Sequence, residues 1–144
     1  MSPVLRGRFS DYAAFHATRG NQACHYVGIP LIVLTLLAAL TKLEIVPAGS
    51  VTLTAAELLL ALVTLYYLTL DRPLALMMLA VSLAFAAIGR AIPLWPAIGL
   101  FVVGWVLQFI GHYVYEKKAP AFYQNLTHLL VGPLWILAKA TGRS

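Results

Sequence analysis

Four histidines are the residues of this sequence best suited to chemistry. Imidazole nitrogens bind zinc, iron, copper and nickel. Four imidazoles can close a tetrahedral zinc site, which would be structural, whereas on an octahedral iron(II) they would leave two positions open for oxygen chemistry. A single histidine near a membrane surface is more often an ordinary hydrogen-bonded residue, so a metal site requires that several of them meet. They are His16, His25, His112 and His128.

A residue with hydrogen-bonding capacity stands four positions before each histidine. Residues four apart lie on the same face of an α-helix. A metal-bound imidazole needs a partner on its second ring nitrogen, which fixes its tautomer and orientation. We therefore expect these four residues to support the histidines from outside the ligand set. In chain order they are Tyr12, Asn21, Gln108 and Gln124.

A carboxylate follows the third histidine at the same spacing. Gln108, His112 and Glu116 fall at positions i, i+4 and i+8, which form one stripe along an α-helix. Two histidines and one carboxylate bind Fe(II) in many oxygenases, so Glu116 is a candidate ligand. It can equally form an ion pair with Lys117 or Lys118. Spacing alone leaves both roles open, as it does the choice between iron and zinc.

The composition excludes several classes of protein. Of the 144 residues, 61% are hydrophobic and 10% are charged, whereas soluble domains carry about 25% charged residues. A chain this short has too little interior to bury so much apolar side chain. The net charge of +5 comes from scattered basic residues, without the patch typical of nucleic-acid binding, and the single Cys24 excludes an internal disulfide. We therefore expect a polytopic membrane protein in contact with lipid.

Apolar runs long enough to cross a bilayer occur four times. A helix of about 18 residues is about 27 Å long, which is close to the ~30 Å thickness of the hydrocarbon core. The sequence therefore predicts an all-α fold, a polytopic membrane helical bundle of about four transmembrane helices with short interfacial helices at both ends. The runs are 26–43, 51–70, 74–88 and 91–110.

The spans group into a single predicted integral-membrane domain that covers residues 1–144. Before the first span, Ser10 is expected to cap a short helix over residues 11–19, because serine is a preferred N-cap residue. The expected divisions are a cytoplasmic N-terminal segment at 1–25, four spans within 26–114, and a cytoplasmic or interfacial C-terminal segment at 115–144.

Basic residues are concentrated on one predicted side of the membrane. Lys and Arg favour cytoplasmic loops, and eight of the ten basic residues fall in the N-terminal segment, the turn at 71–73 and the C-terminal segment. With four spans, both termini face the cytoplasm, and the even number of crossings brings all four histidines to that face. The Ala- and Leu-rich chain is typical of bacteria, so we expect the bacterial inner membrane.

Two motifs at opposite ends of the chain resemble a known family. With these motifs, the sequence resembles the fungal 2-hydroxy fatty acid dioxygenases and their bacterial homologues over about residues 5–140. The middle spans are generic apolar sequence and add little to the resemblance. The N-terminal motif is Phe15-His16, Asn21, His25 and Gly28-Ile29-Pro30-Leu31, and the C-terminal motif is Gln108-Phe109-Ile110-Gly111-His112, Glu116, Pro120-Ala121 and Gly132-Pro133.

The resemblance implies a specific reaction and a specific metal. The reaction is Fe(II)-dependent alpha-oxidation, in which a long-chain 2-hydroxy fatty acid and O2 give the fatty acid one carbon shorter, CO2 and water. Because O2 accepts all four electrons, no reducing cosubstrate is needed. Glu116 matches the acid of the motif and, with Gln108, is expected to be catalytic. The implied iron ligands are His16, His25, His112 and His128.

A non-enzymatic alternative uses the same histidines. A zinc-binding or transport protein of the membrane would hold zinc without consuming O2. The predicted spans contain few polar residues that would line a path through the bilayer, which disfavours transport. The sequence leaves the oligomeric state open.

Overall fold

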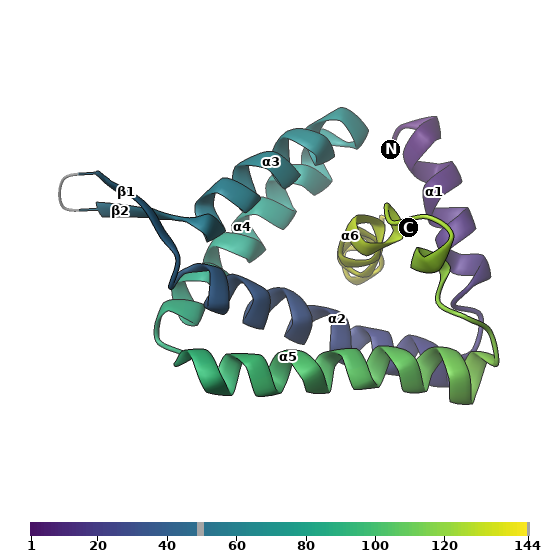
Figure 1. Cartoon of the computed structure of the whole chain (residues 1–144). Coiled ribbons are helices and arrows are strands. Elements are labelled where there is room, and N and C mark those ends of the chain that lie inside the picture. The colour runs from purple at the N-terminus through teal and green to yellow at the C-terminus, as the bar shows by residue number, and fades with distance from the viewer. Residues whose placement is uncertain (49–50, 144) are drawn as a thin grey trace. The chain divides into compact units, whose positions relative to one another are not determined.

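The computed structural model describes residues 1–48 and 51–143, most of which are helical (Figure 1). Contacts within the chain divide it into two units, one formed by residues 1–30 with 103–144 and the other by residues 31–102. The described elements are α1 (Pro3–Ala14), α2 (Arg19–Leu40), β1 (Glu44–Ala48), β2 (Val51–Thr54), α3 (Ala55–Leu70), α4 (Arg72–Arg90), α5 (Leu94–Phe109), the π-helix η1 (Ile110–Glu116), the 3₁₀ turn η2 (Ala121–Tyr123) and α6 (His128–Ala140).

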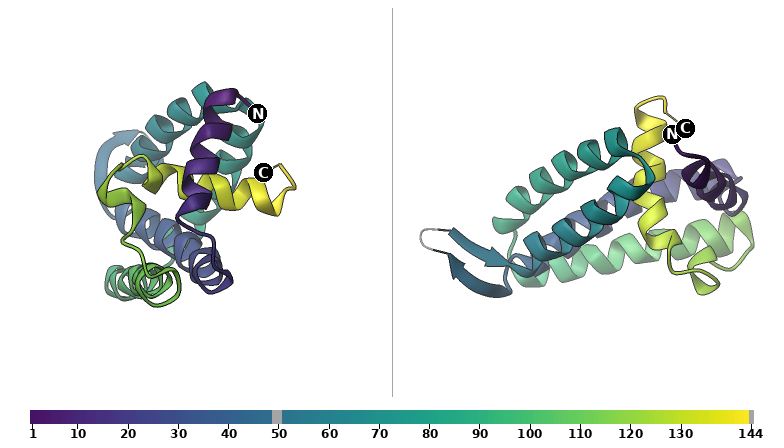
Figure 2. Two further views of the ribbon diagram at one scale, coloured as in Figure 1. Left: turned by 90° about the vertical axis from the view of Figure 1, so that its right-hand side faces the viewer. Right: turned by 90° about the horizontal axis from the view of Figure 1, so that it is seen from above.

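The first unit packs the helices from both ends of the chain against each other. Helix α1 begins at Pro3 because the Ser2 side chain accepts a hydrogen bond from the first turn, and proline suits that turn. Helix α6 crosses α1 (Figure 2). At the crossing, the rings of Tyr12 and Trp135 lie 5.3 Å apart, centroid to centroid. The two chain ends are thereby joined by buried aromatic contacts.

Glycines allow the start of α2 and the end of α5 to approach closely within this unit. A side-chain carbon on Gly28 would overlap Gln108 and lie 2.9 Å from the carbonyl oxygen of Gly104. A carbon on Gly111 would lie 2.7 Å from the side-chain oxygen of Asn21. Because real side chains do not tolerate such distances, the small residues set how near the two segments lie.

The second unit contains the helical hairpin α3–α4 and the strand pair β1–β2. Helices α3 and α4 lie side by side in both views (Figures 1 and 2). The strands are antiparallel, with Glu44 opposite Thr54. Asp71 caps α4 through a hydrogen bond from the backbone of Leu74. The core of this unit is formed by Leu37, Ala56, Leu60 and Ala86.

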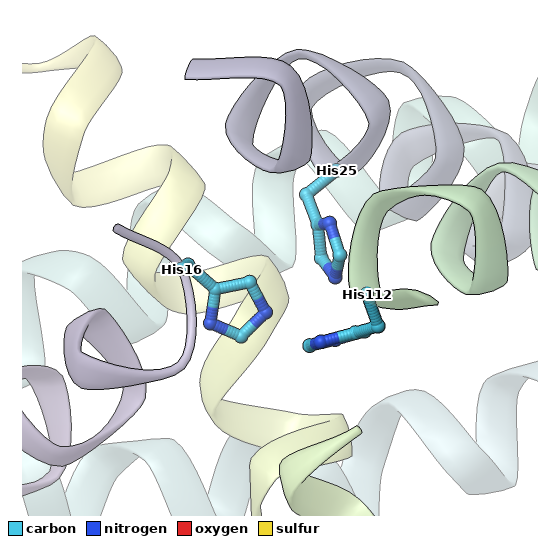
Figure 3. A group of neighbouring side chains, drawn as sticks. All are labelled: His16, His25 and His112. Atoms are coloured by element: carbon cyan, nitrogen blue, oxygen red, sulfur yellow. The ribbon is translucent and has the colours of Figure 1, made fainter. Parts of the chain in front are cut away.

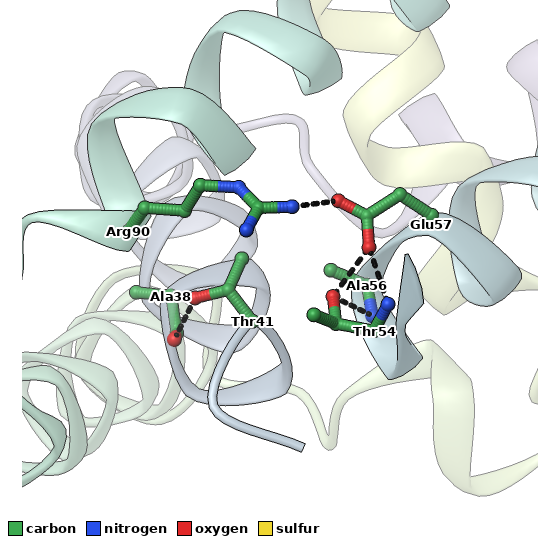
Figure 4. A network of polar contacts seen from close by, with 6 residues as sticks. All are labelled: Ala38, Thr41, Thr54, Ala56, Glu57 and Arg90. Carbon is green, nitrogen blue, oxygen red and sulfur yellow. Dashed lines mark hydrogen bonds and ion pairs between the residues drawn. The ribbon is translucent and has the colours of Figure 1, made fainter. Parts of the chain in front are cut away.

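A polar network fixes the start of α3 (Figure 4). The Glu57 carboxylate accepts from the Thr54 backbone N–H and hydroxyl, and the Thr54 hydroxyl oxygen accepts from the backbone at the start of α3, which completes a capping box. Arg90, at the end of α4, donates to the other Glu57 oxygen at 2.6 Å. Glu57 therefore serves as a helix cap and ties the two helices together.

The predicted helical character is confirmed, and the boundaries differ in places. Among the described residues, three helices are long and apolar enough to cross a membrane. Helix α3 has 16 residues, or about 24 Å, so the fourth predicted span stays a prediction. The three long helices are Arg19–Leu40, Arg72–Ala91 and Leu94–Glu116.

Two local predictions were wrong. The helix expected over 11–19 instead covers Pro3–Ala14, because the pair Ser2-Pro3 supplies an earlier start than Ser10. The second span was expected to begin at residue 51, whereas residues 51–54 form the strand β2, which pairs with β1 in a hairpin before α3. Val51 is apolar and therefore fits a span, although β-branched residues also favour strands.

Replacing Gly28 with alanine should destabilise the protein by about 1–3 kcal/mol, because the new methyl group overpacks the contact between α2 and α5. Gly7→Ala is the matched control, since nothing lies within 4 Å of a side-chain carbon added there. That change should be neutral or stabilising by up to about 1 kcal/mol. Thermal unfolding of both variants in detergent measures the difference, and equal Tm values would contradict the close packing.

Candidate metal centre

Three of the four histidines meet in the first unit (Figure 3). His16 follows α1, His25 lies on α2 and His112 lies on η1. Each is only 2% exposed. One ring nitrogen from each can be chosen so that all three lie within 4.8 Å of one another. Residues nearly a hundred positions apart in the chain thus point their rings at a common space.

Backbone carbonyls orient two of the three rings. His16 Nδ1 is 2.6 Å from the carbonyl oxygen of Tyr12, and His25 Nδ1 is 2.9 Å from that of Asn21. A carbonyl only accepts, so each Nδ1 carries the proton and donates it. Each Nε2 therefore keeps its lone pair, and His16 Nε2 is buried without a hydrogen-bond partner. This is the tautomer that a metal-binding histidine requires.

The third ring lies on an unusual backbone. Residues Ile110–Glu116 form a π-helix, in which hydrogen bonds join residues five apart, and such turns occur frequently at functional sites. The turn ends at Lys117, whose backbone adopts a left-handed conformation with φ of 54°. The α-helical stripe expected for Gln108, His112 and Glu116 is therefore interrupted after Gln108. His112 Nδ1 is buried without a hydrogen-bond partner.

Burial keeps the His16 ring in the neutral form that can bind a metal. Burial lowers the pKa of His16 to about 4, because a charged imidazolium loses its hydration there. The ring is therefore neutral at pH 7 and able to coordinate. Three imidazole donors fit zinc, iron or copper, and three protein ligands are the number found in catalytic sites that keep a position open.

The fourth histidine lies outside this group. His128, the first residue of α6, places Nε2 2.8 Å from the Asp11 carboxylate. Its ring meets Phe15 edge-on at 5.9 Å between centroids and lies 5.8 Å from Tyr12. With Nε2 held by Asp11, only the buried Nδ1 lacks a partner. Its expected role as a fourth ligand stays a prediction.

Glu116 lies beside the three histidines without belonging to the group of ligand atoms. Its carboxylate accepts hydrogen bonds from the backbone of Ala17 and Thr18, and from the side chains of Thr18 and Asn21. Sequence reasoning did not identify Ala17 or Thr18. A threonine just before a helix is a recognisable capping signal, and Thr18 Oγ1 indeed accepts from the Asn21 backbone at 3.3 Å.

The predicted supporting residues fall into different environments. The Tyr12 ring stacks on His16 with 3.9 Å between centroids, so its side chain packs while its carbonyl hydrogen-bonds. Gln108 is buried, and its Nε2 has no hydrogen-bond partner. Gln124 is exposed and lies in the turn after η2. The hydrogen-bond partner of His128 Nε2 is Asp11.

Comparisons with known proteins agree with this centre. A family described as 2-hydroxy-palmitic acid dioxygenase Mpo1-like matches residues 4–144. The 2-hydroxy-palmitic acid dioxygenase MPO1 of Saccharomyces cerevisiae is 33% identical over 134 residues, which cover 92% of this chain and 77% of the yeast protein. No solved structure matches the chain. Because the family matches nearly the full length of this chain and the yeast relative is 33% identical to it, the chain belongs to the 2-hydroxy-palmitic acid dioxygenase Mpo1-like family.

Proposed function

We propose that this protein is an Fe(II)-dependent dioxygenase of long-chain 2-hydroxy fatty acids. One substrate molecule and one O2 give the fatty acid one carbon shorter, CO2 and water. The C1–C2 bond breaks, C2 is oxidised to a carboxyl group and O2 is reduced. Family membership supports the activity. The group of three buried imidazoles is the observation that supports a bound metal.

The three histidines would hold the metal through the nitrogens that point to their common space. His16 and His25 are already in the required tautomer, because their Nδ1 protons are donated to backbone carbonyls. Bound Fe(II) would supply the redox chemistry with O2, and three protein ligands leave positions on it for other ligands. Because the three rings are buried, the site would limit the access of bulk water to the bound metal.

We propose that Gln108 orients the substrate. Its side-chain amide is buried one turn before η1, and Nε2 donates to no acceptor in the described structure. A buried amide without a partner costs about 1–3 kcal/mol, and a functional site is a physical reason for such a group to persist. An oxygen of the 2-hydroxy acid would accept this hydrogen bond.

The membrane would supply the substrate. Three described helices are long and apolar enough to cross a bilayer, and the alkyl tail of a long-chain acid resides in the same medium. We place the protein in the bacterial inner membrane with the metal site and both termini on the cytoplasmic side, as the distribution of basic residues predicts. A 2-hydroxy acid would then present its polar end at the depth of the histidines.

Alanine at His16, His25 or His112 should abolish O2 consumption with 2-hydroxypalmitate and remove bound iron, because each change deletes one of three ligands. The measurements are iron content and O2 uptake by the purified protein in detergent. His128→Ala is the informative fourth variant: retained iron supports a three-histidine centre, and lost iron supports a fourth ligand. Full activity in all of the first three variants would refute the proposal.

Chelation should inactivate the protein reversibly. Removal of the metal leaves three buried imidazoles without their cation, and Fe(II) added back should restore formation of pentadecanoic acid from 2-hydroxypalmitate. Zinc should bind the same nitrogens, because imidazole suits both metals, but should not restore turnover. A purified protein that holds zinc and consumes no O2 after reconstitution with iron would instead favour the non-enzymatic zinc protein.

Gln108→Met should lower activity without lowering stability. The change keeps side-chain length and apolar packing but deletes an amide that lacks a partner when substrate is absent. Removing such a group should leave Tm unchanged or higher, while the KM for 2-hydroxypalmitate rises. Steady-state kinetics and thermal unfolding of the same preparation give both values, and a lower Tm with an unchanged KM would assign Gln108 to structure only.

A further inference from the structure

We infer that Glu116 is a positioning residue that holds the three ligand-bearing segments at the spacing the metal needs. The inference rests on the proposed metal site and assigns Glu116 a role other than that of a ligand. A single carboxylate connects the chain just after His16, the start of α2 that carries His25, and the π-helix that carries His112.

The carboxylate accepts hydrogen bonds at both of its oxygens. Oε1 accepts from the Ala17 backbone N–H at 3.1 Å. Oε2 accepts from the Thr18 backbone N–H at 3.0 Å, the Thr18 hydroxyl at 2.9 Å and the Asn21 side-chain amide at 3.1 Å. A carboxylate offers about four lone-pair sites, two on each oxygen, so the three donors occupy Oε2 and Oε1 keeps one site. The group of nitrogens that could hold a metal does not include this carboxylate, which argues for positioning rather than coordination.

Each donor is adjacent to a histidine ligand. Ala17 and Thr18 directly follow His16 in the chain. Asn21 is the residue whose carbonyl oxygen orients the His25 ring. Glu116 itself is on η1 with His112. The separations between the three rings therefore depend on one side chain, which is 9% exposed.

The segment that carries His16 has little regular structure of its own. Residues 16–18 lie between α1 and α2 outside any helix or strand. Besides its bonds to Glu116, the segment makes hydrogen bonds with neighbouring residues of the chain, among them the His16 N–H to the Ala13 carbonyl, His16 Nδ1 to the Tyr12 carbonyl and the Gln22 side chain to the His16 carbonyl. Hydrogen bonds to a charged acceptor are stronger than neutral ones, and the bonds to Glu116 are the ones that join this segment to η1.

The test is Co(II) binding by the metal-free protein in detergent, followed by its visible absorption. Glu116→Gln keeps the volume, but its amide N–H₂ would face a backbone N–H donor. Loss of a residue that orients metal ligands typically weakens metal binding roughly 10–100-fold, and we expect a loss of this size. The absorption bands of bound Co(II) should also shift, because the ligand geometry relaxes.

The matched control is Glu57→Gln, which makes the same chemical change in the other unit. Glu57 also accepts backbone and hydroxyl donors at a helix start and pairs with Arg90. This variant should lower Tm and leave both the Co(II) affinity and the Co(II) spectrum at the wild-type values. The control separates loss of a hydrogen-bonded carboxylate in general from loss of the one beside the histidines.

Three results overturn the inference. One is a Glu116→Gln protein that binds Co(II) with wild-type affinity and spectrum, even if its Tm falls. Another is a wild-type protein that binds no Co(II), which would refute the metal centre of the proposed function as well. If Glu116→Gln does not fold, Thr18→Val takes its place as the test, because it deletes one hydrogen-bond donor to Oε2. Unchanged Co(II) affinity in the Thr18→Val protein is the third result that overturns the inference.

Discussion

Three imidazoles share a buried space in which each must present an unprotonated nitrogen. Desolvation alone would keep the His16 ring neutral, but it would not decide which nitrogen holds the proton. The backbone makes that choice, because the carbonyl oxygens of Tyr12 and Asn21 accept from the Nδ1 atoms of His16 and His25. Both bonds are local, so they orient each ring within its own segment, whereas the hydrogen bonds of Glu116 join these segments to η1.

Much of this site could be predicted from residue types and spacing. Their position at the ends of apolar runs indicated that all four histidines would meet. The structure brings His16, His25 and His112 together, whereas His128 contacts Asp11 outside this group. The spacing of four also placed Tyr12 and Asn21 beside their histidines. The acceptors, however, are main-chain carbonyls, which every residue has, so the identity of the side chain gave no information about this bond.

Other features depend on contacts that a linear pattern does not contain. Asp11 lies 117 positions from His128, and their hydrogen bond forms only because α6 crosses α1. Strand β1 falls between two predicted apolar runs, and β2 was predicted as the start of the second run, since hydropathy does not separate a short strand from a span. The π-helix gave no signal either, because its residues fit an α-helix equally well.

The π-helix at Ile110–Glu116 also limits how this region tolerates changes in length. A π-turn differs from an α-turn by one residue, so deletion of a single position there would allow the chain to return to regular bonding between residues four apart. A deletion between His112 and Glu116 would also shorten their separation from four residues to three, which would change the direction of Glu116 relative to His112 and carry its carboxylate away from its donors. The number of residues in this turn is therefore constrained as firmly as their chemical identity.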